Sequence, residues 1–173
     1  MSRDTTTSQP KPAGPFTGGC GCRAVRYTLP KRPIYIHACH CRYCQRETGS
    51  SFALNAMYEE PLVRPSAESA RQPELVRTPA RSGNPQTIAR CPECRVAVWS
   101  NYGKHGGDRL TVVRVGTLDD PGAWGFEPEM HIYTSTKQPW VVLPDHVPGV
   151  PEFYDFKDYW PQNRLDRLAK ALS

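Results

Sequence analysis

The chain has 173 residues, a length that suits one domain with one sizeable core, and its 18 prolines favour loops and short strands over long helices. The formal net charge of +5 at pH 7 is too small and too scattered to indicate a nucleic-acid-binding protein. No run of about eighteen apolar residues is present, so the sequence predicts no membrane-spanning helix.

The first predicted element is a disordered tail over residues 1–15, which are polar and rich in proline and threonine. This tail lacks the apolar stretch of a signal peptide, so we expect a protein of the reducing cytoplasm. Disulfides are rare in that compartment, and clustered cysteines there are best interpreted as metal ligands.

Short runs rich in β-branched and aromatic residues follow the tail and predict strands. These runs are residues 24–29, 33–38, 51–58, 74–78, 97–102 and 109–118, and residues 131–143 are predicted as an extended segment that closes the sheet. The other residues between 61 and 86 are polar and broken by prolines, so we expect loops there. The predicted class is mainly β.

The clearest helical pattern lies at the end of the chain. Leu165, Leu168, Ala169 and Leu172 recur at i, i+3, i+4 and i+7, which predicts a short C-terminal helix. Asn163 is the candidate N-cap of this helix.

Seven cysteines fall into three clusters at the spacings of metal ligands. The clusters are GGCGC with Cys20 and Cys22, CHCRYC with Cys39, Cys41 and Cys44, and CPEC with Cys91 and Cys94. Zinc prefers four tetrahedral ligands in structural sites, and seven ligands cannot complete two such sites. The economical partition closes one site with the two outer pairs and leaves a three-cysteine site with an open position, which is typical of catalytic zinc.

Three alternatives to this partition remain open. All seven cysteines could be ordinary buried thiols. The last two cysteines of CHCRYC could pair with those of CPEC as a zinc ribbon, which leaves the remaining three poorly placed. His37 or His40 could complete the three-cysteine site, although His40 lies between two ligands and is expected to point away from the metal.

An open zinc site with three thiolates has a characteristic chemistry. Three thiolates on a dication leave a net negative charge, which makes the ion a weak Lewis acid for a carbonyl group or water. Such a site is better suited to accept a substrate thiol and to hold it deprotonated, as a nucleophile at neutral pH. The residues therefore predict a thiol that attacks an electrophilic carbon.

Five sequence blocks, taken in order, resemble the glutathione-dependent formaldehyde-activating family. The blocks are GGCGCRAVRY, ACHCRYCQRETGSSFAL, CPECRVAVWS, VRVGTLDDP and HIYTSTKQPWV, and they span about residues 16–143. That family shares its domain with centromere protein V and has an Mss4-like, β-tent fold. The resemblance therefore implies a β-tent with zinc knuckles, followed here by a short C-terminal helix.

The resemblance also implies an activity and two metal sites. The activity is that of a carbon–sulfur lyase, which adds glutathione to formaldehyde and forms S-(hydroxymethyl)glutathione. The implied ligands are Cys20, Cys22, Cys91 and Cys94 for a structural zinc, and Cys39, Cys41 and Cys44 for a catalytic zinc. We expect two zinc ions per chain, with the second site the more labile.

By the same resemblance, the segment TGSSF lines the mouth of the pocket. Gly49 and Ser50 would offer backbone N–H groups to a carboxylate, and Phe52 would form an apolar wall, although a tight turn into a strand explains all three equally well. Arg42 and Arg46 could attract an anionic substrate, but solvation of the surface is their default role. His131 and Trp140 match family positions, and core packing is the default role of both.

The sequence departs from the family pattern at two positions. Glycine usually follows the second cysteine of each structural pair, whereas Arg23 and Arg95 occupy these positions here. Glycine there permits a positive φ angle, so arginine predicts either an altered turn or accepted strain. We also hypothesise that the two guanidinium groups offset the negative charge of a four-thiolate zinc site.

The sequence thus predicts a tail over residues 1–15, a zinc-binding domain over 16–147 and a C-terminal extension over 148–173. The leading function is a zinc-dependent lyase that acts on a glutathione-like thiol and an aldehyde. The rival is a non-catalytic interaction module in which both metals are structural. A nucleic-acid partner is disfavoured because no long basic tract is present.

Overall fold

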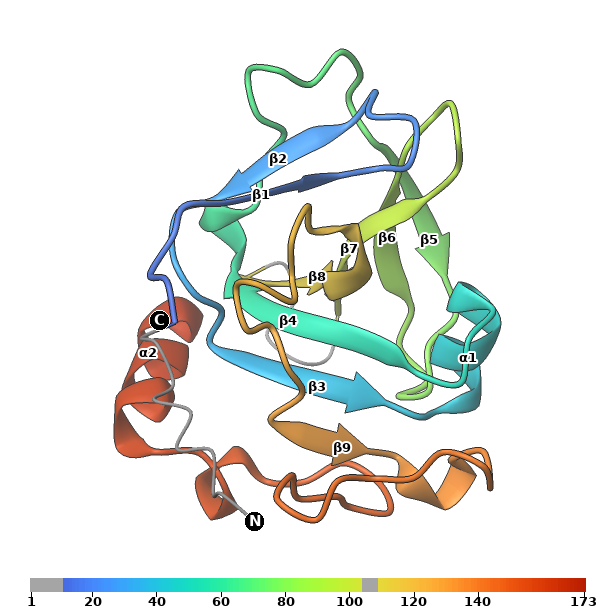
Figure 1. Cartoon of the computed structure of the whole chain (residues 1–173), viewed down its shortest axis with the longest axis vertical. Helices are drawn as coiled ribbons and strands as arrows, with labels where there is room; N and C mark the ends of the chain where they lie inside the picture. The colour runs from blue at the N-terminus through green and yellow to red at the C-terminus, as the bar shows by residue number, and fades with distance from the viewer. Residues whose placement is uncertain (1–10, 104–108) are drawn as a thin grey trace, which may run out of the picture.

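The computed structural model describes residues 11–103 and 109–173 (Figure 1). In these residues nine strands form a seven-stranded sheet, in the order β5-β6-β7-β8-β4-β3-β9, and a two-stranded hairpin of β1 and β2. The strands are β1 (Phe16–Gly19), β2 (Arg26–Leu29), β3 (Tyr35–Cys39), β4 (Ala53–Glu59), β5 (Glu74–Thr78), β6 (Gln86–Arg90), β7 (Ala97–Tyr102), β8 (Leu110–Arg114) and β9 (Met130–Ile132). The helices are α1 (Arg42–Thr48) and α2 (Gln162–Leu172), with single 3₁₀ turns at η1 (Glu60–Leu62), η3 (Val115–Thr117), η4 (Thr134–Thr136) and η5 (Phe156–Asp158).

Two different layers cover the two faces of the large sheet. Its strands pair antiparallel except for β3 and β9, which run parallel. Every residue of the central strands β3 and β8 is buried, as expected for strands that are packed on both faces. In Figure 1 the β1–β2 hairpin lies across one end of the sheet, and the C-terminal segment follows the β9 edge toward α2.

The hairpin covers a core built from alternate residues of the sheet. Tyr27 of β2 packs edge-on against Trp99 of β7 at 5.8 Å, and Phe16 of β1 packs against Phe126 at 4.9 Å. The Arg26 guanidinium pairs with the Asp119 carboxylate, which joins the hairpin to the loop that follows β8. This face therefore forms the larger of the two apolar cores.

The C-terminal extension covers the second core. Trp160 stacks on Tyr35 of β3 with 4.6 Å between ring centroids, and Leu168 of α2 is buried in the same cluster. Arg167 of α2 donates two hydrogen bonds of 2.7 Å to the Glu59 carboxylate at the end of β4. The extension is thus packed on the same sheet that carries the cysteine clusters.

The prediction of a mainly β domain with cysteine knuckles and a C-terminal helix is confirmed. The predicted strands at 74–78 and 97–102 match β5 and β7. The predicted closing segment 131–143 overlaps β9 only at residues 131–132, and the 3₁₀ turn η4 follows, so most of this segment is not a strand. The prediction missed β1, β6 and α1. The predicted Asn163 cap is wrong, because α2 begins at Gln162 after Pro161, and the N-cap position makes no side-chain hydrogen bond.

Two further expectations concern the start of the chain and the membrane. Residues 1–10 of the predicted tail lie outside the described residues, whereas Lys11 forms an ion pair of 3.0 Å with Glu127. None of the described helices is long and apolar enough to cross a membrane.

Candidate metal centres

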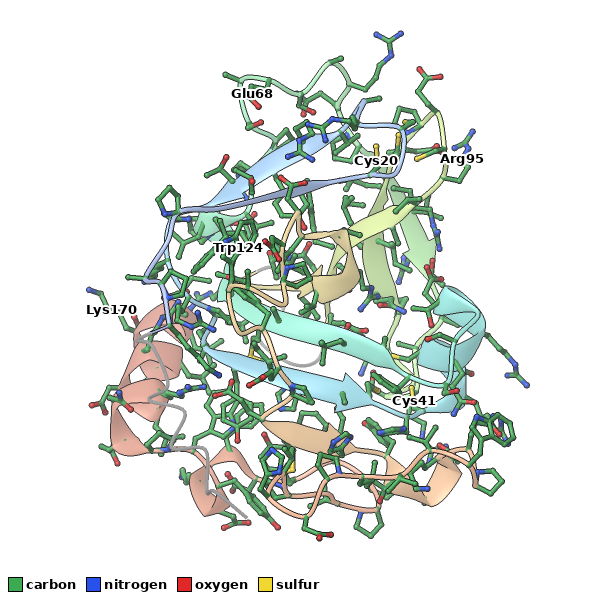
Figure 2. All side chains as sticks on the ribbon, viewed as in Figure 1. Cys20, Cys41, Glu68, Arg95, Trp124 and Lys170 are labelled. Carbon is green, nitrogen blue, oxygen red and sulfur yellow. The ribbon has the colours of Figure 1, made fainter. Side chains whose placement is uncertain are left out.

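Four cysteines from two turns meet near one end of the β1–β2 hairpin. Cys20 and Cys22 lie between β1 and β2, and Cys91 and Cys94 lie between β6 and β7. Their sulfur atoms all lie within 4.8 Å of one another, with 3.5 Å between those of Cys20 and Cys22. A zinc ion about 2.3 Å from each of four tetrahedral thiolates would separate the sulfurs by about 3.8 Å, so the donor set fits zinc. Figure 2 labels Cys20 and Arg95 at this end of the molecule.

The two turns have the same hydrogen-bonding pattern. In each, the N–H of the first cysteine donates to the carbonyl of the valine five residues later at 3.0 Å, and the arginine N–H donates to the carbonyl of the first cysteine at 3.0 Å. Arg23 and Arg95 have φ angles of 66° and 63°, in the left-handed region that favours glycine. The turn is therefore retained and its strain is accepted, which decides between the two outcomes expected for these arginines.

The two glycines before the first turn have a steric role. A Cβ atom on Gly18 would lie 2.4 Å from the Tyr27 hydroxyl, and one on Gly19 would lie 2.3 Å from the Val25 carbonyl oxygen. Neither glycine has a positive φ angle. Glycine is needed here because the two strands of the hairpin approach closely, and the cysteine turn begins directly after it.

The other three cysteines meet where β3 ends and α1 begins. Cys39 is the last residue of β3, Cys41 is the N-cap of α1, and Cys44 lies in its first turn. All three are buried, their sulfur atoms lie within 4.8 Å of one another, and the Cys44 N–H donates to Cys41 Sγ at 3.4 Å. The cluster is labelled through Cys41 in Figure 2, well apart from Cys20.

The crowding of these three thiols has an electrostatic consequence. Hydrogen bonds from Cys39 and Cys44 lower the pKa of Cys41 to about 3. The hydrogen bonds with Cys41 and Cys44, together with burial, raise the pKa of Cys39 well above the ordinary thiol value. One thiolate is therefore favoured and further thiolates are disfavoured, unless a cation offsets their charge. The donor set thus fits a soft dication such as zinc.

Neither candidate histidine belongs to the three-cysteine cluster. His37 Nε2 lies 2.8 Å from the Tyr154 hydroxyl, which also accepts a hydrogen bond of 2.7 Å from Trp160 Nε1. Burial lowers the pKa of His37 to about 3, so this histidine is neutral. Among the described residues, the group of mutually close ligand atoms at this site contains the three cysteines and no histidine.

His40 points to a different partner, as expected for a residue between two ligands. Its Nε2 atom lies 2.9 Å from His131 Nδ1, and its ring packs 5.2 Å from that of Phe52. Burial, and then the proximity of His131, lower the pKa of His40 to about 4. His40 therefore packs on both His131 and Phe52 and joins the connection between β3 and α1 to β9.

A cavity of about 90 Å³ adjoins the three sulfur atoms. Its walls are mostly apolar, with a few polar groups among them. The residues that line it are His37, Cys39, Cys41, Tyr43, Cys44, Asn55, Met57, Ala80, Arg81, Ser82, Gln86, Tyr102, Leu110, Val112, Ile132, Tyr133 and Phe153. A mostly apolar pocket with few polar groups is typical of a small-molecule site.

The cavity is enclosed by two segments that are distant in sequence. The loop between β5 and β6 supplies Arg81, and the C-terminal extension supplies Phe153. Arg81 forms an ion pair of 2.8 Å with Glu152 and lies 5.6 Å above the ring of Tyr133. These contacts join the two segments over the cysteine cluster.

The residues predicted to contact substrate lie elsewhere. Gly49 and Ser50 line a separate surface groove together with Arg42, Arg46 and Trp140. The backbone N–H groups expected to bind a carboxylate already have partners, since Gly49 N–H donates to the Gln45 carbonyl at 2.8 Å and Ser50 N–H donates to Thr48 Oγ1 at 3.3 Å. Trp140 is 70% exposed, so it does not have the core role that was its default.

Several polar residues of the site were not foreseen from the sequence. Asn55 of β4 and Tyr102 of β7 line the cavity. Arg114 of β8 does not line it and is buried, with 6% of the residue exposed. A signal was present, because Asn55 and Arg114 are polar residues in strands that are otherwise mostly apolar. Their proximity could not be foreseen, because it depends on the register between β4 and β8.

Comparison with known proteins adds one match. The model of the family described as glutathione-dependent formaldehyde-activating enzyme matches residues 15–136. The match contains all seven cysteines and ends before the C-terminal extension that encloses the cavity. The curated proteins contain no match to this chain.

Proposed function

Because this chain belongs to the glutathione-dependent formaldehyde-activating family, we propose that it is a carbon–sulfur lyase that joins a substrate thiol to a small aldehyde. In this reaction the thiol sulfur forms a bond with the aldehyde carbon, and the thiol proton ends on the aldehyde oxygen. The observation that carries the proposal is the three-cysteine cluster, whose sulfur atoms border the cavity.

The two cysteine clusters have different proposed roles. Cys20, Cys22, Cys91 and Cys94 would hold a structural zinc ion, and Cys39, Cys41 and Cys44 would hold a catalytic one. With three protein ligands, the second ion would supply an open coordination position at which a substrate thiol is kept deprotonated. We expect two zinc ions per chain, and all seven cysteines are free thiols that could serve as their ligands.

The chain's own residues prepare the cavity for this reaction. Its apolar walls exclude water, and the neutral imidazole of His37 adds no charge beside the cluster. Asn55 Oδ1 accepts a hydrogen bond from Arg114, so its amide nitrogen is directed elsewhere. Because Asn55 lines the cavity, we propose that this nitrogen donates to the aldehyde oxygen.

The two proposed substrates differ in how well they fit the volume of the cavity. A volume of about 90 Å³ accommodates a small aldehyde and is small for a tripeptide such as glutathione. We propose that only the thiol-bearing part of glutathione enters. Its carboxylates would then lie outside the cavity, in the separate groove lined by Arg42, Arg46, Gly49 and Ser50.

The test follows adduct formation between glutathione and formaldehyde by proton NMR, above the uncatalysed rate. We expect the wild-type protein to accelerate the reaction and to hold two zinc ions, and the Cys44→Ser variant to lose both the acceleration and one ion. Arg46→Gln is expected to raise the KM for glutathione more than it lowers kcat. Equal rates with and without the wild-type protein would instead favour the interaction module with two structural metals.

A further inference from the structure

Arg114 is a buried cation with incomplete partners. It ends β8, is 6% exposed and donates from Nη1 to Asn55 Oδ1, the residue opposite it on β4. Its Nε and Nη2 atoms are buried without a hydrogen-bond partner in the described residues. A buried charge is costly unless a group of opposite sign offsets it. The position of Arg114 therefore requires an anion nearby.

Three ionisable neighbours of Arg114 could supply this anion. Tyr102 interacts with Arg114 electrostatically and by a hydrogen bond, and Cys44 and Glu47 interact with it electrostatically. Burial raises the pKa of Tyr102, so this phenol is uncharged at neutral pH. The Glu47 carboxylate pairs with Arg90 Nη2 at 2.5 Å, so its single charge is shared between Arg90 and Arg114. Cys44, a member of the three-cysteine cluster, is the neighbour that can supply a further negative charge.

The charge of a loaded cluster matches this requirement. Three thiolates and one divalent ion carry a net charge of −1, and a substrate thiolate would make it −2. All three cysteines are buried, so water offsets this charge less than at the four-cysteine site, where Cys22 is exposed to solvent. The two sites therefore differ in their need for a countercharge from the protein.

We propose that Arg114 is the countercharge of the three-cysteine metal site, and that it strengthens the binding of the metal and of a thiolate as its fourth ligand. Arg114 is a positioning residue here, because it does not line the cavity and acts through Cys44 and Asn55. The inference rests on the proposed function, since it presupposes a metal ion at these cysteines.

The experiment is a competition between the protein and a chromophoric zinc chelator at equilibrium, with the metal content of each chain measured in parallel. For Arg114→Gln we expect zinc affinity at the three-cysteine site to fall by about 10- to 100-fold, as for other partners of metal ligands. Affinity at the four-cysteine site of the same chain is the internal control and should stay within about twofold of wild type, because the countercharge acts locally. Arg77→Gln, which removes an exposed charge from β5, should change neither site.

Arg114→Lys separates charge from shape. It retains the positive charge but loses the planar guanidinium, so we expect it to hold the second zinc ion more tightly than Arg114→Gln. Equal affinities of wild type and Arg114→Gln at the three-cysteine site would overturn the inference. If Arg114→Gln does not fold, loss of the second zinc ion in a folded Arg114→Lys would overturn it, and retention would support it. Absence of the second ion from the wild-type protein would also overturn it, but that failure belongs to the proposed function and is seen without any variant.

Discussion

Arg23 and Arg95 occupy left-handed backbone in two cysteine turns with the same hydrogen-bonding pattern, although arginine is unfavourable there. A non-glycine residue in this region costs about 1–2 kcal/mol, and glycine gives back part of the difference through the greater entropy of the unfolded chain. The turns are still formed, since their hydrogen bonds and the cysteine cluster over-determine the backbone. Local strain is therefore present beside the proposed structural metal.

This strain predicts that Arg23→Gly stabilises the protein. We expect the free energy of unfolding of the zinc-loaded protein to rise by about 0.5–1 kcal/mol, as measured by urea denaturation. Arg23→Ala is the control, because it also removes the guanidinium but keeps a Cβ atom in left-handed backbone. A gain of the same size in both variants would show that the charge, and not the backbone, is responsible.

The same pair of variants tests the charge hypothesis for these arginines. If the Arg23 guanidinium offsets the charge of four thiolates, both variants should release zinc to a chelator more readily than wild type. Arg95 is less suited to this role, because its guanidinium already pairs with Glu74. Arg23 is exposed, so solvent screening should keep any such effect small.

At this scale the cysteines were predictable and their polar neighbours were not. The division into four and three follows from counting ligands along the chain, and the sulfur atoms are grouped in this way. Asn55 and Arg114 are 59 residues apart and meet only because β4 and β8 pair in one register. A single sequence contains the alternation of each strand but not the register between them.

Among the elements, α1 illustrates a different reason for a missed prediction. It has only seven residues, of which Cys44 and the polar Gln45 are buried. So short a segment with one buried apolar residue has no helical periodicity that could be recognised in the sequence. Its ends are set by Cys41 as N-cap and by Gly49, whose φ of 67° closes the helix. The helix is thus defined by the metal-ligand motif itself.

The attachment of α2 to the sheet predicts a dependence on pH. Hydrogen bonds from Arg167 and Lys31 outweigh the effect of burial and lower the pKa of Glu59 to about 2. A carboxylate whose pKa is depressed on folding contributes stability above its unfolded pKa of about 4.3, and this contribution is lost as the pH falls toward 2. With allowance for solvent screening, the contribution is about 1–2 kcal/mol.

The measurement compares urea denaturation of wild type and Glu59→Gln at pH 7 and pH 3. We expect wild type to be more stable by about 1–2 kcal/mol at pH 7, and the difference to fall by about half at pH 3, because pH 3 lies between the folded pKa of about 2 and the unfolded pKa of about 4.3. Loss of zinc in acid affects both proteins and cancels in the comparison. A difference that is independent of pH would show that Glu59 does not act through its charge.

The C-terminal extension predicts a second effect, on access to the cysteines. Phe153 closes the cavity from outside the family match, so Phe153→Ala should expose the three thiols of the metal-free protein. We expect them to react several-fold faster with a bulky disulfide reagent, and we expect glutathione turnover to rise relative to that of a smaller thiol. Val142→Ala, at a position that is 90% exposed and also lies beyond the family match, is the control and should change neither rate. Unchanged thiol reactivity in Phe153→Ala would show that the cavity opens by another route.

For the whole molecule, the two cysteine clusters have different relations to the fold. The four-cysteine cluster joins the β1–β2 turn to the β6–β7 turn, and its members Cys22 and Cys91 are 69 residues apart in the sequence. The cluster thus attaches the hairpin that covers the larger core. The three cysteines of the other cluster lie within one β3–α1 connection, which is also held by Gln45 Nε2 donating to the His40 carbonyl at 2.6 Å. A metal at the first cluster therefore closes a long loop, and a metal at the second closes a short one.

This difference predicts unequal effects of losing each metal. Cys94→Ser should lower the free energy of unfolding by at least about 3 kcal/mol, because metal binding across distant segments adds directly to folding stability. For a chain of this size that corresponds to a fall in Tm of roughly 6–12 °C. Cys44→Ser should lose one zinc ion and the proposed activity with a much smaller fall in Tm. The measurement is calorimetry of both variants beside their zinc content, and a Tm that falls further in Cys44→Ser than in Cys94→Ser would reverse the assignment of structural and catalytic sites.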